Sequence, residues 1–145
     1  MIALLQRVQQ AHVVVEQQVV GQIGSGLLVF AAVQADDTPA RIVKMAERLL
    51  AYRLFADEQG RMNCSLSQTR GGLLLVSQFT LAADTRSGLR PSFSAAASGE
   101  QAQAGFALLL EECRSRHHIV ETGVFAADMQ VHLVNDGPVT FCLNS

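Results

Sequence analysis

A short polar segment at the end of an apolar run is the part of the sequence best suited to chemistry. The apolar residues 73–76 are followed by Ser77, Gln78, Phe79 and Thr80. A hydroxyl of Ser77 or Thr80 could act as a nucleophile, and the Gln78 amide or nearby main-chain N–H groups could hold an oxyanion. The same residues also fit a strand that leaves the core with its side chains bonded to neighbouring backbone. Spacing alone leaves both interpretations open.

The tetrapeptide 135–138, Asn-Asp-Gly-Pro, is a second candidate, and it separates two stretches of alternating apolar and polar residues. Asp-Gly in such a place favours a hairpin turn, and proline is tolerated as the first residue of a strand. The Gly137–Pro138 peptide could also adopt the cis form at modest cost. It would then present two fixed carbonyl oxygens as an acceptor surface for an ammonium group. The local pattern favours the plain turn.

Two further pairs of residues could contact a nucleotide. Arg86 and Arg90 lie in a predicted loop, and arginine suits bidentate recognition of phosphate, although solvated loop arginines are the ordinary alternative. Phe125 and Met129 border the last predicted strands and could sandwich a base, although core packing is the ordinary alternative.

The histidines and cysteines form no pattern of metal ligands or disulfides. His117 and His118 adjoin each other at a predicted helix end, where we expect them in solvent because cations complement the helix dipole. His12 and His132 lie on predicted strands without a spaced partner ligand. The three cysteines are odd in number and widely spaced. The sequence therefore predicts no metal site, no cofactor and a reducing, cytoplasmic location.

The elements that must position these residues follow from hydrophobic periodicity and from capping signals. Thr38 and Pro39 start a predicted helix to about residue 53, and Ser98 with Gln101 forms a capping box at the start of a second helix. Predicted strands cover residues 2–9, 11–20, 27–33, 73–81, 129–133 and 139–143, with a short hairpin within 54–72 and a loop over 82–97. This order predicts an α/β fold in which two helices cover a mixed sheet.

Length and composition predict one domain, residues 1–145, and a homo-oligomer. Of the 145 residues, 49% are hydrophobic and only 17% are charged, so the chain has few charges with which to cover a small globule. The longest apolar run, 27–33, is too short to cross a membrane. We therefore expect the apolar excess to lie in the core and in a twofold dimer interface. The formal net charge of −2 excludes wrapping of nucleic acid by bulk electrostatics, so any such contact should be local.

Three motifs, found in order in a chain of this length, resemble the D-aminoacyl-tRNA deacylase family. They are residues 77–81 (Ser-Gln-Phe-Thr-Leu), 88–93 (Gly-Leu-Arg-Pro-Ser-Phe) and 135–140 (Asn-Asp-Gly-Pro-Val-Thr). The resemblance extends over the whole chain, from Gln6-Arg7-Val8 through 125–129 to the C-terminus. It implies a small α/β domain with barrel-like sheet packing in a homodimer. It also implies hydrolysis of the ester that joins a D-amino acid, or glycine, to the terminal adenosine of tRNA.

The same resemblance implies roles for individual residues. Gly137 and Pro138 match a cis peptide that enters the partner subunit's pocket, faces the substrate's α-amino group and leaves no room for an L side chain. Arg7 matches the arginine that braces this element. Ser77, Gln78, Phe79 and Thr80 match the opposite, catalytic wall of the pocket. Phe125 and Met129 match positions near the terminal adenine.

Two mechanisms and two other functions stay open at this point. Thr80 could be a nucleophile, or the 2′-hydroxyl of the terminal adenosine could assist water while N–H groups near Phe79 and Thr80 hold the oxyanion. We prefer the second mechanism because no histidine or carboxylate lies near Thr80 in sequence except Asp84. A non-catalytic module that binds RNA ends, or an esterase for small molecules, would fit the residues without the resemblance.

Overall fold

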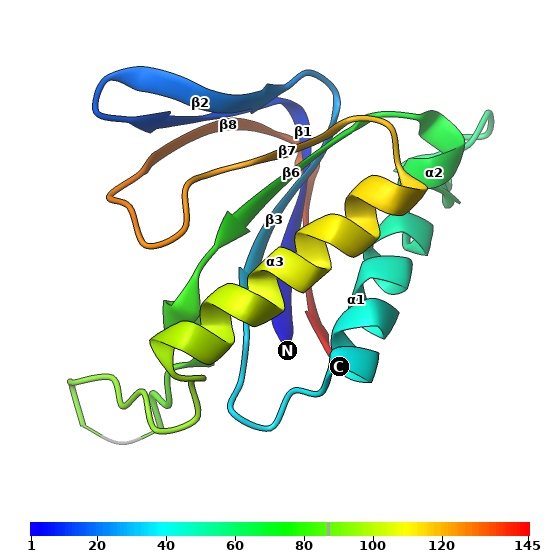
Figure 1. The fold of residues 1–145 in the computed structure, drawn as a ribbon. Helices are drawn as coiled ribbons and strands as arrows, with labels where there is room; N and C mark the ends of the chain where they lie inside the picture. The colour runs from blue at the N-terminus through cyan, green and yellow to red at the C-terminus, as the bar shows by residue number, and fades with distance from the viewer. Residues whose placement is uncertain (87) are drawn as a thin grey trace.

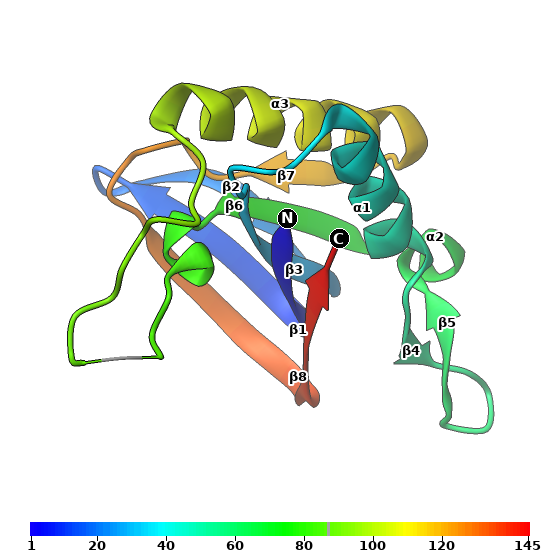
Figure 2. The ribbon, with the colours of Figure 1, turned by 90° about the horizontal axis from the view of Figure 1, so that it is seen from below.

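The computed structural model describes residues 1–86 and 88–145; Ser87, within the predicted loop 82–97, lies outside the described residues. Two long helices cover one face of a strongly curved sheet (Figures 1 and 2). In chain order the elements are β1 Ile2–Val15, β2 Gln18–Ile23, β3 Gly26–Ala32, α1 Pro39–Ala51, β4 Arg53–Ala56, β5 Met62–Ser65, α2 Leu66–Thr69, β6 Gly72–Ser77, the 3₁₀ helix η1 Phe79–Ala82, α3 Gly99–Arg116, β7 Val120–Thr122 and β8 Gln130–Asn144.

The main sheet is mixed, as predicted, and is barrel-like. Its order is β2-β1-β3-β6-β7, with β8 paired to β1; β3–β6 and β6–β7 are parallel and the other pairs are antiparallel. The edge strands β2 and β7 come close together, since a Cβ atom on Gly21 would lie 2.5 Å from the Thr122 carbonyl oxygen. The expected α/β class with two main helices is confirmed, although the short helix α2 and the strand β7 were not predicted.

Two predicted strands at the N-terminus, 2–9 and 11–20, are wrong: residues 2–15 form one strand. The turn falls later, at Glu16 and Gln17, whose φ angles are 48° and 66°. A two-residue hairpin loop needs positive φ at both positions and usually recruits Asn or Gly, so Glu-Gln carries no sequence signal for it. Gln9 and Gln10, at the junction of the two predicted strands, are exposed at the point where the register between β1 and β8 shifts.

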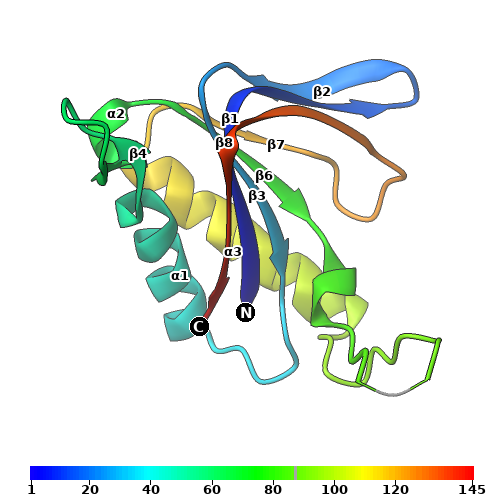
Figure 3. The same ribbon diagram turned by 180° about the vertical axis from the view of Figure 1, so that it is seen from behind.

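The predicted hairpin turn at 135–138 is also wrong, because β8 is one strand that follows β1 along its length (Figure 3). Val8 pairs with Asn135 and Gln6 pairs with Thr140. The residues between Asn135 and Thr140 therefore leave the ladder as a wide bulge. The Asn135 side chain compensates by donating to the carbonyl oxygens of Arg7 (2.9 Å) and Val139 (3.0 Å).

The two long helices begin where the sequence predicts. The Thr38 hydroxyl accepts from the Arg41 N–H at 3.4 Å, with Pro39 in the first turn of α1, and Ser98 forms the capping box with Gln101 at the start of α3. The apolar faces of both helices pack into the core between α1, α3 and the sheet; their buried members include Ile42, Ala46, Leu49, Leu50, Phe106, Leu109 and Cys113. A second apolar cluster lies against β1, β3 and β6 and includes Val8, Leu28 and Val76.

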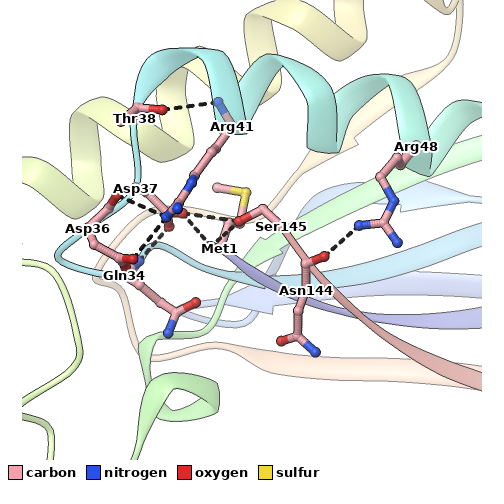
Figure 4. Close-up of polar contacts among 9 residues, drawn as sticks. All are labelled: Met1, Gln34, Asp36, Asp37, Thr38, Arg41, Arg48, Asn144 and Ser145. Carbon is pink, nitrogen blue, oxygen red and sulfur yellow. Dashed lines mark hydrogen bonds and ion pairs between the residues drawn. The ribbon is translucent and has the colours of Figure 1, made fainter.

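A polar network joins both ends of the chain to the loop before α1 (Figure 4). The Met1 ammonium group contacts the buried Asp37 carboxylate and donates to the Ser145 hydroxyl at 2.6 Å. The second oxygen of Asp37 accepts from the Gln34 N–H at 2.7 Å, and Arg48 donates to the Asn144 carbonyl oxygen at 2.5 Å. These contacts fasten the paired ends of β1 and β8 to the helix layer.

His117 is not in solvent, contrary to the prediction. Its side chain is buried, and its main-chain N–H donates to the Cys113 carbonyl oxygen at 2.9 Å. The Nε2 atom of its ring lies 2.7 Å from the Gly71 carbonyl oxygen. The chain turns at His117 into β7 beside β6, and this burial was not foreseen because β7 was missed. His118 is exposed, as expected. Among the described helices, none is long and apolar enough to cross a membrane.

Gly26 should be intolerant of any side chain. It pairs with Gly72 between the parallel strands β3 and β6, and a Cβ atom on it would lie 2.0 Å from the Gly72 carbonyl oxygen. Forcing the strands apart should make Gly26→Ala lower the free energy of unfolding by about 2–3 kcal/mol, measured by urea denaturation. Gly24→Ala is the matched control, because nothing lies within 4 Å of its Cβ position. Equal midpoints for the two variants would contradict this description of the β3–β6 contact.

Candidate functional site

A cavity of about 520 Å³ opens where four segments of the chain meet: the carboxyl ends of β3 and β6, the first turns of α3 and the segment before β8. The carboxyl end of β6, the first turns of α3 and the segment before β8 lie at the same end of the molecule (Figures 1 and 2). Of the sequence candidates, the cavity brings together Ser77, Gln78, Phe79, Phe125 and Met129. The carboxyl ends of neighbouring parallel strands are a common place for a ligand site in an α/β sheet.

One wall of the cavity is built where β6 ends. The strand stops at Ser77 rather than at residue 81, and a 3₁₀ turn begins at Phe79. The Gln78 N–H still donates to the Ala31 carbonyl oxygen of β3 at 2.8 Å, which fixes the turn to the sheet. The Gln78 side-chain amide donates to the Thr80 hydroxyl at 2.6 Å. Thr80 itself does not line the cavity and is exposed beside it.

Phe125 and Met129 line another part of the cavity and also pack against the core. The Phe125 ring packs against Phe106 of α3 with 6.2 Å between ring centroids, and Met129 packs against the second apolar cluster. Core packing and ligand contact are therefore compatible, because each side chain has one face in the core and another at the cavity. Ala126 between them has a φ of 60°, which turns the chain around the cavity.

The cavity wall is chemically mild. No carboxylate, imidazole, amine or thiol from the described residues lines it; its polar side chains are the Ser77 hydroxyl and the Gln78 amide. Such a wall can donate hydrogen bonds and bind a flat apolar group, but it lacks a strong base or acid. Among residues 1–86 and 88–145 no group of three potential metal ligands gathers either.

The only carboxylate close to Thr80 in sequence is already engaged. Asp84 accepts from Arg86 at 2.6 Å and 2.9 Å, and this hydrogen bonding holds the pKa of the Asp84 carboxyl below its usual value. A carboxyl with a lowered pKa is a weaker proton acceptor, so Asp84 is poorly suited to act as a base for Thr80. Arg86 and Arg90 are both exposed on the loop and do not line the cavity.

Arg7 organises a second cluster around the bulge of β8. Its guanidinium donates to the carbonyl oxygens of Leu54 (2.8 Å) and Asp136 (3.2 Å) and pairs with the Asp136 carboxylate at 3.1 Å. The adjoining Gly137–Pro138 peptide is cis, and both residues are exposed. Leu54 lies outside the 135–140 motif and accepts the Arg7 hydrogen bond through its main-chain carbonyl oxygen. Its side chain therefore gave no sequence signal for this role.

The two clusters are separate within one chain. None of Arg7, Gly137 and Pro138 lines the cavity. The cavity wall is completed instead by small residues that sequence reasoning missed, among them Ala31, Ala97, Gly99 and Ala102. Small side chains leave space in the wall but carry no reactive or hydrogen-bonding group. They are therefore recognised as wall residues only in the folded structure.

Comparison with known proteins gives a consistent family. The sequence profile of the family described as D-Tyr-tRNA(Tyr) deacylase matches residues 4–144. A protein of Cellvibrio japonicus (strain Ueda107) named D-aminoacyl-tRNA deacylase is 59% identical over 143 residues, covering 99% of this chain and 98% of the relative. A protein of the same name from Stenotrophomonas maltophilia (strain K279a) is 61% identical over 144 residues, covering 99% of each chain.

Solved structures show the same fold. A structure titled "c-Myc DNA Unwinding Element Binding Protein" has a TM-score of 0.96 and 36% identity, covering 100% of this chain and 99% of the other. A structure of a probable eukaryotic D-amino acid tRNA deacylase has a TM-score of 0.86 at 17% identity, covering 98% and 97% of the two chains. The second likeness bears on the fold alone.

Arg7→Lys should loosen the bulge of β8. A lysine ammonium group cannot reproduce the fork that reaches Leu54 and Asp136 together, so partly buried carbonyl oxygens lose their donor. We expect a loss of about 1–3 kcal/mol in the free energy of unfolding, measured by urea denaturation. The control is Arg86→Lys, whose ion pair with Asp84 is exposed and should leave the midpoint unchanged. Equal effects of the two substitutions would rule out a bracing role for Arg7.

Proposed function

The chain belongs to the D-Tyr-tRNA(Tyr) deacylase family, and we propose that it hydrolyses the ester between a D-amino acid, or glycine, and the terminal adenosine of tRNA. The chain is accordingly a hydrolase, and free amino acid and tRNA are the products. The observation that carries the proposal is a nucleotide-sized cavity that has apolar walls and only mild hydrogen-bonding groups. An aminoacyl ester is already activated relative to an amide, so orientation and an oxyanion donor suffice.

Recognition of a single RNA end agrees with the charge of the chain. With a net charge of −2, the protein cannot wrap a large nucleic acid surface. An unpaired terminal base can instead be held by stacking and by edge contacts. In the proposal, Phe125 and Met129 lie against the terminal adenine, and Arg86 and Arg90 are candidates for nearby phosphates. Transfer RNA is a cytoplasmic substrate, so the proposal places the enzyme in the cytoplasm, without a cofactor or metal.

Rejection of L-amino acids is assigned to Gly137 and Pro138 of a second copy in a homodimer. The proposal needs the second copy because these residues do not line the cavity of their own chain. Their exposure leaves them available to a partner, and the Arg7 and Asn135 contacts keep the main chain rigid. Carbonyl oxygens facing the substrate's α-amino group would leave no space for an L side chain. A clash of about 3–4 kcal/mol corresponds to roughly 200- to 1,000-fold discrimination.

For the chemical step we propose hydrolysis assisted by the substrate. Water attacks the ester carbonyl carbon and passes a proton to the 2′-hydroxyl, while the 2′-hydroxyl proton moves to the departing 3′-oxygen. The carbon–oxygen ester bond then breaks, and main-chain N–H groups at Phe79 and Thr80 hold the transient oxyanion. The Thr80 hydroxyl accepts a hydrogen bond from Gln78, and no described residue accepts its proton, which disfavours the nucleophile alternative. The neutral cavity wall adds further support.

Hydrolysis assays on matched esters test the function. The protein at catalytic concentration should release the amino acid from D-tyrosyl-tRNA and glycyl-tRNA and leave L-tyrosyl-tRNA intact. Protection of the D-ester without release would indicate an RNA-binding module. Cleavage of simple aryl esters at a comparable rate would indicate a general esterase. In Gly137→Ala, with φ at +129° and a Cβ 2.7 Å from Val139 Cγ2, discrimination against the L-ester should weaken.

Two substitutions separate the mechanisms. D-tyrosyl-tRNA ending in 2′-deoxyadenosine should be hydrolysed at least about 100-fold more slowly, because the proton relay is lost. Thr80→Ala should retain turnover within about tenfold of the parent protein, with Thr80→Ser as the matched control that keeps a hydroxyl. Single-turnover rates give both comparisons. Normal hydrolysis of the deoxy substrate together with an inactive Thr80→Ala would reverse the assignment and make Thr80 the nucleophile.

A further inference from the structure

A concave basic surface lies at the end of α3 opposite to the cavity. It is lined by residues from the C-terminal end of α3 and from the short helix α2, which lie at the same end of the molecule (Figure 1). We call it the α2–α3 basic surface and define it by Arg70, Arg114, Arg116, His117 and His118, with two serines completing a hollow of about 560 Å³. No carboxylate lines it among the described residues. In a chain of net charge −2, this is a local excess of positive charge.

Not all of these cations are free. Arg116 donates to Glu112 at 2.6 Å and approaches Glu47 at 3.7 Å, so its charge is already compensated. His117 is buried and held by the Gly71 carbonyl oxygen. Arg70, Arg114 and His118 are exposed, and no carboxylate in the described part of the chain pairs with them. Arg70 is itself the left-handed residue that ends α2, with a φ of 56°.

The helix end itself does not attract an anion. The C-terminal end of a helix carries partial negative charge, which opposes a bare phosphate. Binding here must therefore come from Arg70 and Arg114, whose guanidinium groups suit phosphate oxygens, with support from His118. Two or three cations in a shallow hollow match a phosphate backbone better than a single small anion.

The spacing between this surface and the cavity fits an RNA strand. Ala102 lines the cavity and Arg114 lines the basic surface on the same helix. Twelve helical residues separate them, which is about 18 Å at about 1.5 Å per residue. A stacked strand advances about 3.4 Å per nucleotide, so about five nucleotides cover the distance. With the terminal adenosine in the cavity, that length reaches past the unpaired CCA end to the first base pairs of the acceptor stem.

We propose that the α2–α3 basic surface binds the phosphate backbone of the tRNA acceptor stem while the terminal adenosine occupies the cavity. This inference rests on the proposed function and adds a second contact that a free aminoacyl-adenosine cannot make. The exposed residues of α3 between the two sites are Gln103, Ala104, Ala107 and Glu111, and Glu111 is the only charged residue among these four.

The test uses the full-length protein with both arginines replaced. Arg70→Glu with Arg114→Glu should raise KM for D-tyrosyl-tRNA, and the Kd for uncharged tRNA, about tenfold at moderate salt, as expected for two phosphate contacts. The slope of log affinity against log salt should decrease by about two. Hydrolysis of D-tyrosyl-adenosine should be unchanged. The neutral pair Arg70→Gln with Arg114→Gln should show a smaller change in the same direction and serves if the charge-reversed protein does not fold.

The control makes the same change in charge elsewhere. Lys44 on α1 and Arg61 in the β4–β5 turn are both exposed, and Lys44→Glu with Arg61→Glu should leave the tRNA parameters near those of the parent. Equal losses in the control, unchanged tRNA affinity in the test pair, or an equal loss on D-tyrosyl-adenosine would each overturn the inference. Failure of the parent protein to hydrolyse either substrate would instead overturn the proposed function. The Kd values of the variants for uncharged tRNA would still test whether the α2–α3 basic surface binds tRNA.

Discussion

The pairing of β1 with three neighbours at once is the constraint on which the rest of the structure depends. β1 carries β3 and β2 on successive parts of one edge and β8 on the other. Because β8 follows β1 on both sides of the bulge, the segment 136–139 is fixed at each end and cannot move as a free loop. Because β3 then pairs with β6, the end of β6 at Ser77 is fixed relative to the same strand. Both parts of the proposed site therefore depend on one ladder.

The sequence predicts those elements whose signals are local. The start of α1 at Thr38 and Pro39, the capping box at Ser98 and the buried run 27–33 all depend on neighbouring residues, and all are confirmed. The errors at Glu16–Gln17 and at 135–138 have another cause. In both places, pairing with a distant strand decides whether the chain continues or turns, and local propensity cannot report such pairing. His117 became buried for the same reason, through contact with Gly71.

Prediction of the site shows a similar division. The motif around Ser77 was recognisable because polar residues follow an apolar strand, and the fold brings it together with Phe125 and Met129 at one cavity. The alanine and glycine residues that shape the remaining wall could not be found, since their contribution is the absence of bulk. Periodicity alone also could not show that Arg7 and Gly137 stand apart from that cavity within one chain. That separation is what makes a second copy part of the proposal.

The lack of ionisable groups on the cavity wall has a consequence for inhibition. Reagents that inactivate cysteine and serine hydrolases react with a thiolate or with a hydroxyl that a neighbouring imidazole activates. The wall described here offers an electrophile no such atom, and the most deeply buried thiol, Cys113, has its pKa raised to about 12 by desolvation. Blocking this pocket would instead require a non-hydrolysable analogue with the shape of the proposed ester substrate.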